Sequence, residues 1–191
     1  MNLVDLSGKT VLFLGSSVTY GAASGGVSFV EIMAEKLGFN YIKEAVSGTT
    51  LADINESSYV SRLKKIDKNL KIDLFVCQLS TNDSYQNVPL EETGQAIVFI
   101  VDYVRTAFGC PVVFYTGTRF DSVGYGETVK LLIELKEKYH FCCLNLWDDE
   151  DMLSVSKEGY KRYMKDGVHP TYLGYKEWWA PKFTEFLYSN F

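Results

Sequence analysis

Residues 10–21 read TVLFLGSSVTYG, and this stretch decides how the rest of the chain is interpreted. A short apolar run stops at Gly15, and two serines, a β-branched pair and a second glycine follow it. An uninterrupted apolar run of this length is typical of a strand that is buried on both faces of a parallel sheet. We therefore expect a buried strand over 10–15, whose carboxyl end opens into a polar loop.

The same alternation of apolar runs and polar loops continues along the chain. Strands are expected at 10–15, 41–46, 72–80, 111–117 and 141–147. Segments with helical apolar spacing lie at 27–38, 58–69, 91–108, 125–139 and 172–189. Strands that alternate with helices form right-handed βαβ units, whose helices cover both faces of a parallel sheet. The sequence thus predicts an α/β fold with three layers and a five-stranded, mainly parallel sheet.

Length and charge narrow the class of protein. The chain has 191 residues without a Pro/Gly/Ser-rich linker, so we expect a single domain over 1–191. A net charge of −5 and the lack of a basic stripe interleaved with aromatic residues argue against a nucleic-acid partner. The basic stretch at 62–71 is interpreted as a solvated helix face. The four cysteines lie in or beside apolar runs without a C-x-x-C pair, which indicates buried reduced thiols and no zinc site.

Both ends of the chain bear on whether the protein meets a membrane. The stretch 1–15 carries an early acidic residue and an apolar run too short for a signal peptide or a membrane span, which favours a cytoplasmic protein. Near the other end, aromatic and aliphatic residues recur at helical spacing: Trp178, Trp179, Phe183, Phe186 and Leu187. We interpret this stripe as core packing, with a membrane or dimer face as the alternative.

The polar loops after the expected strands are the first place to look for a site, because ligands of open parallel sheets bind beyond the carboxyl ends of the strands. These loops hold hydroxyls, an amide and an Asp/His pair, in GSSVTYG, SGTTLAD, STNDSYQN, GTRFDSVGYG and KDGVHPT. This is the inventory for acyl transfer through a serine, here Ser17. Such a serine needs an imidazole base, and the imidazole needs a carboxylate that fixes its tautomer.

The chain has two histidines, and their positions separate them. Each has an acidic residue three positions earlier, Glu137 before His140 and Asp166 before His169. His140 lies where a helix enters the fifth expected strand, at the amino-terminal edge of the sheet, which favours a structural role. His169 follows that strand in a loop and is the candidate base, with Asp166 as its partner. The alternative is that Asp166 only caps a turn before the next helix.

An acyl-transfer site also needs donors that face the developing oxyanion. The backbone N–H groups of Ser17 and Gly48 and the side-chain amide of Asn82 are the candidates. Taken alone, Gly48 is equally an ordinary turn glycine, and Asn82 an Asx turn after a strand.

Four blocks together resemble the SGNH hydrolases, also called the GDSL family of esterases and lipases. The first family block, Gly-Asp-Ser-x-Thr-x-Gly, is matched by residues 15–21, and the glycine of the second block by Gly48. The third block, Gly-x-Asn-Asp, is matched by 80–83, and the last, Asp-x-x-His, by 166–169. The blocks occur in the family order, each on an expected post-strand loop.

This resemblance implies a flavodoxin-like three-layer fold with neither a metal nor an organic cofactor. It implies Ser17 as nucleophile, His169 as base and Asp166 as the orienting partner of His169. It also implies an oxyanion hole made of the Ser17 N–H, the Gly48 N–H and Asn82.

Two positions depart from the family pattern. Ser16 stands where the family has an aspartate outside the triad, so we expect altered hydrogen bonding in the loop and retained chemistry. Ser80 replaces the glycine of the third block, which puts the backbone geometry that carries Asn82 in question.

Loops around the expected triad should set specificity. The candidate substrate contacts are Tyr20, Tyr85, Arg119, Phe120 and Tyr125. The long polar loop after the fourth expected strand favours a short-chain or O-acetyl ester, including a carbohydrate ester, over a long aliphatic chain. The main hypothesis is therefore a serine esterase. Two alternatives stay open: an acyltransferase or thioesterase with the same residues, and a non-catalytic carbohydrate-binding module.

Overall fold

The strands form one parallel sheet in the order β2-β1-β3-β4-β5 in the computed structural model, which describes residues 5–191. They are β1 (Thr10–Gly15), β2 (Asn40–Ala45), β3 (Leu74–Gln78), β4 (Val112–Tyr115) and β5 (Cys142–Leu144). In the register, Leu12 of β1 aligns with Ile42 on one side and Phe75 on the other. This strand order is flavodoxin-like and confirms the predicted α/β class. Residues 1–4 of the expected domain and of the N-terminal stretch considered above lie outside the described residues.

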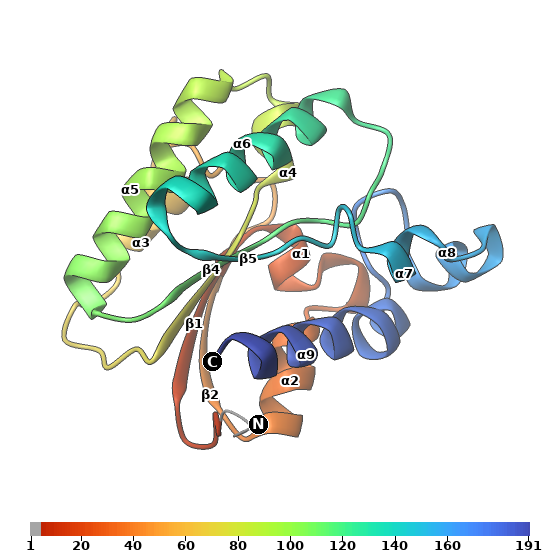
Figure 1. The fold of residues 1–191 in the computed structure, drawn as a ribbon, viewed down its shortest axis with the longest axis horizontal. Coiled ribbons are helices and arrows are strands. Elements are labelled where there is room, and N and C mark those ends of the chain that lie inside the picture. Colours follow the sequence, from red (N-terminus) through yellow and green to blue (C-terminus); the bar gives the residue numbers. More distant parts are fainter. Residues whose placement is uncertain (1–4) are drawn as a thin grey trace.

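Helices cover both faces of this sheet (Figure 1). One face carries α2 (Phe29–Leu37), the π-helix η2 (Gly174–Trp179) and α9 (Ala180–Asn190). The other face carries α3 (Tyr59–Lys64), α5 (Leu90–Phe108) and α6 (Val123–Tyr139). These elements correspond to the helices expected from apolar spacing.

Several short helices in segments expected to be loops were not predicted. They are α1 (Ser17–Tyr20), η1 (Ala22–Ser24), α4 (Thr81–Tyr85), α7 (Glu150–Leu153) and α8 (Lys157–Tyr163). One or two helical turns are too short to show an apolar period, and helices of this length depend on tertiary contacts. The sequence pattern therefore could not reveal them, although α1 and α4 begin at or next to candidate site residues.

Side chains of β1 alternate between two apolar cores. Leu12 and Leu14 pack with the core under α3, α5 and α6. Val11 and Phe13 pack with the opposite core, which includes Phe29 of α2. Because successive strand residues face opposite sides of a sheet, one continuous apolar run serves both cores. The carboxyl edge of the sheet is left to polar loops.

The C-terminal aromatic stripe belongs to the core, as interpreted from the sequence. Trp179, Phe183 and Leu187 are at most 2% exposed. The ring of Phe183 stacks on that of Phe29 with centroids 4.1 Å apart and meets that of Tyr115 edge-on at 5.0 Å. Within residues 5–191, no helix has both the length and the apolar character that crossing a membrane requires.

The prediction of a solvated helix face at 62–71 is wrong for Arg62. Helix α3 ends at Lys64, and the Arg62 side chain is only 8% exposed. It is buried because its guanidinium finds acceptors on β1, β2 and the loop after β2. Helical spacing places Arg62 on a face but does not show what that face meets.

The cysteines differ in their surroundings. All are free, but only Cys77 and Cys110 are buried, so the prediction of buried thiols holds for these two. Burial raises the pKa of the Cys77 thiol well above its usual range and that of Cys110 to about 11. Cys142 and Cys143 on the edge strand β5 are partly buried.

Phe29→Ala is expected to lower the free energy of unfolding by about 3–5 kcal/mol, because it leaves a cavity in a close-packed core. Phe29 is 0% exposed and contacts the rings of Tyr115, Trp179 and Phe183. Urea denaturation followed by circular dichroism measures the loss. Leu70→Ala, at a 41% exposed position, is the control and should change the value by no more than about 0.5 kcal/mol. Equal losses in the two variants would contradict the packing described.

Candidate active site

Three side chains from opposite ends of the chain form a hydrogen-bonded row at the carboxyl edge of the sheet. His169 Nε2 lies 2.8 Å from Ser17 Oγ. His169 Nδ1 lies 2.9 Å from Asp166 Oδ2 and 3.1 Å from Asp166 Oδ1. A proton on Nδ1 satisfies the carboxylate and leaves Nε2 free to accept the serine proton. The row has the geometry of an activated nucleophile.

Ser17 owes its position to the turn between β1 and α1. A Cβ on Gly15 would lie 1.7 Å from Thr19 Oγ1, so the chain can turn here only without a side chain at position 15. The side chain of Gln78, on the neighbouring strand β3, binds this turn. Its Oε1 accepts hydrogen bonds from the Ser16 N–H at 3.0 Å, the Thr19 N–H at 3.2 Å and the Thr19 hydroxyl at 2.8 Å.

Gln78 is a residue that the sequence analysis missed. It is 2% exposed, in a strand whose other members are apolar. A lone amide in an apolar strand run is the sequence feature that could have indicated it, because buried polar groups need partners. Its position at the carboxyl end of β3 places that partner at the serine turn.

Two tyrosines fix α1 against the core. The Tyr175 hydroxyl of η2 donates to the Val18 carbonyl at 2.7 Å, and the Tyr115 hydroxyl lies 2.6 Å from Thr19 Oγ1. Burial raises the pKa of both tyrosines, so their hydroxyls stay protonated and keep their hydrogen bonds. The C-terminal element η2 thus supports the helix that begins with Ser17.

The loop at 166–169 is folded around the Asp166 carboxylate. Asp166 Oδ1 accepts the N–H groups of Val168 at 2.7 Å and His169 at 2.8 Å, and the Lys165 N–H donates to the His169 carbonyl at 2.8 Å. Partial burial acts to raise the pKa of Asp166, but hydrogen bonds from these two N–H groups and from the imidazole outweigh it and lower the pKa. The two roles considered for Asp166, turn cap and partner of the imidazole, coincide in one carboxylate.

The expected oxyanion donors are linked through Thr49. Gly48 has a φ of +80°, which favours glycine, and its carbonyl accepts from Gln86 Nε2 at 3.1 Å. Asn82 Nδ2 donates to the Thr49 carbonyl at 2.9 Å, which leaves the amide a second N–H. The Ser17 N–H belongs to the first turn of α1, where an amide has no intrahelical acceptor.

Serine suits position 80 although the family pattern has glycine there. Its φ of −72° and ψ of 129° are ordinary for a residue with a side chain. The Ser80 hydroxyl caps α4 by accepting the Asn82 N–H at 3.1 Å, and it donates to the Thr49 carbonyl at 3.3 Å. The other departure, Ser16, is fully buried, and its Oγ has no hydrogen-bond partner among residues 5–191.

Asp83 ties the second loop to the third. It is 1% exposed, and it accepts the N–H groups of Leu51 at 2.7 Å and Ala52 at 2.9 Å as well as the Thr93 hydroxyl at 3.2 Å. In the sequence, Asp83 belongs to the third block, 80–83, and has no predicted role. Its contacts give it one, because they hold the loop that carries Gly48 against α4, which carries Asn82.

A cavity of about 680 Å³ opens over Ser17 and His169. It is lined mainly by small polar side chains with two aromatic ones: Ser17, Thr81, Asn82, Ser84, Tyr85, Asn87, Phe120, Asp121, Ser122, Gly124, Val168 and His169. Of the expected substrate contacts, Tyr85 and Phe120 lie on its wall. A second cavity, of about 670 Å³, shares Phe120, Asp121 and Ser122 with the first and extends to Trp147.

The other three expected contacts are not brought to the Ser17 cavity. Tyr125 is fully buried, and its hydroxyl accepts from the Gly117 N–H at 2.8 Å. Arg119 lines the second cavity, where it pairs with Asp148. Tyr20 is 46% exposed, with the Lys43 ammonium 5.7 Å from its ring centroid. A tyrosine near a helix start looks the same in sequence whether its ring faces a cavity or the core.

His140 lies away from this site. It ends α6 with a φ of 55°, two residues before β5 begins, and its carbonyl accepts from Arg105 Nη2 at 2.9 Å. This is the amino-terminal edge of the sheet, where the sequence analysis expected a structural histidine.

Comparisons with known proteins bear on the same region. The sequence matches the GDSL-like lipase/acylhydrolase family over residues 13–177. No curated protein matches it significantly. Among solved structures, a protein from Lactobacillus plantarum is 20% identical with a TM-score of 0.83, over 97% of this chain and 99% of that one.

Two enzymes of known class share the fold. An acetylxylan esterase from Geobacillus stearothermophilus is 15% identical with a TM-score of 0.74, and the match covers 96% of each chain. A family two carbohydrate esterase from Clostridium thermocellum, solved in complex with cellohexaose, is 14% identical with a TM-score of 0.71, over 93% of this chain and 62% of that one. At these identities the likeness shows a common fold.

Asp166→Asn is expected to destabilise the protein at neutral pH, and the loss should vanish in acid. A carboxyl whose pKa is lowered by folding contributes stability above its unfolded pKa, about 3.9, and that contribution is lost as the pH falls through the lower folded pKa. Urea midpoints of wild type and variant at about pH 7 and about pH 2 measure the gap. Val168→Ala leaves the Asp166 carboxylate in place, so its urea midpoint should differ from that of the wild type by the same amount at both pH values. An Asp166→Asn gap that persists in acid would contradict the assignment.

Proposed function

This chain belongs to the GDSL-like lipase/acylhydrolase family, and from that premise we propose that it is a serine esterase for short-chain or O-acetyl esters, including those carried by carbohydrates. The observation that carries the proposal is the row of Ser17, His169 and Asp166, with contacts of 2.8 and 2.9 Å on a cavity of about 680 Å³. A serine hydroxyl bonded to an oriented imidazole is activated for attack on a carbonyl carbon.

In the proposed acylation step, Ser17 Oγ attacks the ester carbonyl carbon while His169 Nε2 takes the hydroxyl proton. The carbonyl oxygen becomes an oxyanion, which accepts hydrogen bonds from the N–H groups of Ser17 and Gly48 and from Asn82 Nδ2. Asp166 keeps the imidazole oriented and stabilises its charged form. When the tetrahedral intermediate collapses, the bond to the alcohol oxygen breaks, and the alcohol leaves with the proton from His169.

Deacylation repeats these steps with water. His169 takes a proton from water, the hydroxide oxygen attacks the acyl carbon, and the carboxylic acid leaves as Ser17 Oγ recovers the proton. An alcohol or thiol in place of water would make the same residues an acyltransferase. Analysis of the products in water and in the presence of added alcohols distinguishes the two reactions.

The linings of the two cavities support a short acyl group on a polar alcohol. Small polar side chains such as Ser84 and Asn87 lie on the wall of the Ser17 cavity, where they can form hydrogen bonds with a polar alcohol. The second cavity shares Phe120 with the first, and the partly exposed ring of Trp147 lies on its wall. A sugar attached to the ester oxygen could extend into it and pack on that ring. The fold shared with two carbohydrate esterases agrees with this substrate class.

A fluorophosphonate is expected to form one covalent adduct, on Ser17. Intact-mass spectrometry of the wild type and peptide mapping measure it. Ser17→Ala should show no adduct, and His169→Ala should react far more slowly because the hydroxyl loses its base. Ser84→Ala is the matched control, since Ser84 lines the same cavity away from the imidazole row, and its adduct should match that of the wild type. Folded wild type without an adduct would overturn the esterase proposal.

The proposed substrate class predicts acyl-chain selectivity. We expect kcat/KM for p-nitrophenyl acetate to exceed that for the octanoate by at least about 10-fold, because a long alkyl chain would cover the polar side chains on the wall of the Ser17 cavity without bonding them. Trp147→Ala should lower kcat/KM for an acetylated xylo-oligosaccharide and leave that for p-nitrophenyl acetate unchanged. A preference for octanoate, or equal losses on both acetyl substrates, would contradict this assignment.

A further inference from the structure

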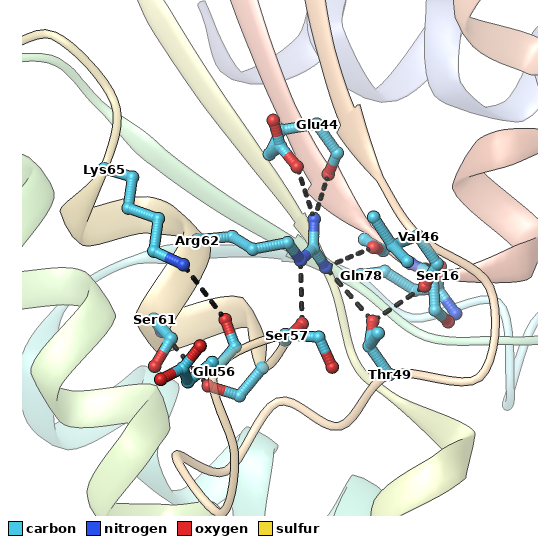
Figure 2. Close-up of polar contacts among 12 residues, drawn as sticks. Ser16, Glu44, Val46, Thr49, Glu56, Ser57, Ser61, Arg62, Lys65 and Gln78 are labelled. Carbon is cyan, nitrogen blue, oxygen red and sulfur yellow. Dashed lines mark hydrogen bonds and ion pairs between the residues drawn. The ribbon is translucent and has the colours of Figure 1, made fainter.

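The buried guanidinium of Arg62 bonds two of the chain segments that carry the proposed oxyanion donors, the end of β1 and the turn after β2 (Figure 2). Its Nε donates to the Ser57 carbonyl at 2.9 Å. Its Nη1 donates to the carbonyl of Glu44 at 2.9 Å and to the carboxylate of Glu44 at 3.0 Å. Its Nη2 donates to the Gly15 carbonyl at 2.8 Å and to Thr49 Oγ1 at 3.1 Å. These five acceptors use all the N–H groups of the guanidinium.

Two of these acceptors lie next to the proposed catalytic groups. Gly15 is the last residue of β1, two positions before Ser17. Thr49 follows Gly48, and its carbonyl accepts the Asn82 amide at 2.9 Å. One planar group therefore binds both the strand end that leads to Ser17 and the turn that carries Gly48, and through Thr49 it reaches Asn82.

The turn after β2 is itself closed around the oxygen that Arg62 binds. Thr49 Oγ1 donates to the Val46 carbonyl at 2.7 Å, and the Val46 N–H donates to the Gly15 carbonyl at 3.2 Å. Figure 2 shows Val46 and Thr49 on one side of the guanidinium, with Glu44 and Ser57 on its other sides. The Tyr59 ring lies 5.2 Å from the guanidinium carbon and is fully buried. Arg62 is thus restrained in both position and plane.

We propose that Arg62 is a positioning residue that holds the N–H groups of Ser17 and Gly48 and the Asn82 amide in the arrangement of an oxyanion hole. This rests on the proposed esterase function. Its action is indirect, because its contacts are to Gly15 and Thr49 and it does not line the Ser17 cavity. Preorganised donors are effective only when their separation is already correct, and this is what the guanidinium maintains.

The fixed arrangement of five N–H donors in the fork of the guanidinium, rather than the positive charge alone, explains why position 62 is an arginine. Four of the five acceptors are uncharged oxygens, and the remaining one is the Glu44 carboxylate, whose side chain is 37% exposed. A buried charge with so little opposite charge is costly unless each of its N–H groups is bonded. A lysine at this position would carry the same charge with three donors on a single nitrogen, so it could not bind Ser57 and Glu44 together with Gly15 and Thr49.

Arg62→Lys and Thr49→Val test the proposal. Arg62→Lys keeps the charge and loses the fork, and Thr49→Val keeps the guanidinium and removes the oxygen that it binds in the turn. Leu63→Ala is the matched control, since Leu63 is fully buried beside Arg62 on the same helix. Truncating its side chain destabilises α3 but removes no hydrogen bond of the turn at 46–49. Hydrolysis of p-nitrophenyl acetate is measured per active site, with sites counted by fluorophosphonate labelling.

We expect kcat and kcat/KM of both variants to fall together by about 10- to 100-fold, with KM within about twofold of the wild type, because an oxyanion donor acts in the transition state. Asn82→Ala, with a loss of about 10²–10³, sets the scale for removing one donor. The midpoint of the pH profile should stay unchanged, because neither variant alters a hydrogen bond of His169. Leu63→Ala should lower the urea midpoint and keep kcat.

The outcomes separate this proposal from the one on which it rests. If the wild type hydrolyses the ester and Arg62→Lys and Thr49→Val have the same kcat as the wild type, the positioning role is overturned and the esterase proposal stands. Full activity in Arg62→Lys alone would also overturn it, because charge without the fork would then suffice. Folded wild type with neither turnover nor adduct would overturn the esterase proposal and this one with it. The variant that combines Arg62→Lys with Thr49→Val tests whether Arg62 acts through Thr49. If the two losses in kcat simply add on a free-energy scale, that part of the proposal is overturned, because residues that act through one another give non-additive effects.

Discussion

The architecture of the site depends on the absence of a side chain at Gly15. The space that its Cβ would occupy is filled by Thr19, which lies in the turn that follows. Strand β1 lies between β2 and β3 in a sheet that helices cover on both faces. Its last residue, Gly15, is therefore buried, and so is the Gly15 carbonyl. That carbonyl accepts hydrogen bonds from Arg62 and from Val46. A glycine at one strand end thus determines where α1 begins and what must surround it.

Around this point, buried polar groups link segments that are distant in sequence. Gln78 binds the turn after β1, Asp83 binds the loop after β2, and Arg62 joins the two. A hydrogen bond to a charged group contributes roughly 1.5–3 kcal/mol to stability, and a buried donor or acceptor left without a partner costs a comparable amount. Because Gln78 Oε1, the Asp83 carboxylate and the Arg62 guanidinium each bond several groups at once, the network allows few alternative arrangements. The His169 loop is built differently, with its turn closed locally by the Asp166 carboxylate and by the bond from the Lys165 N–H to the His169 carbonyl.

Much of the fold and part of the site could be predicted because both follow from local patterns. Apolar runs marked the strands, and the parallel order placed Ser17, Asn82 and His169 at the same edge. The missing parts are those with no local pattern. Short helices such as α1 and α4 have no measurable period. Tyr125 is buried with its hydroxyl bonded to Gly117, and no spacing rule relates these two residues.

The sequence by itself determined which chain segments are buried strands, and therefore which loops meet at the carboxyl edge of the sheet. It did so because side-chain alternation and strand length are local properties. Only the tertiary structure decided which side chains in those loops touch. Ser17 and His169 are 152 residues apart in the chain, and Arg62 reaches Gly15 across 47 residues. Helical spacing made Arg62 look solvated, because periodicity describes one element, whereas a buried hydrogen-bonded charge is defined by the several elements around it.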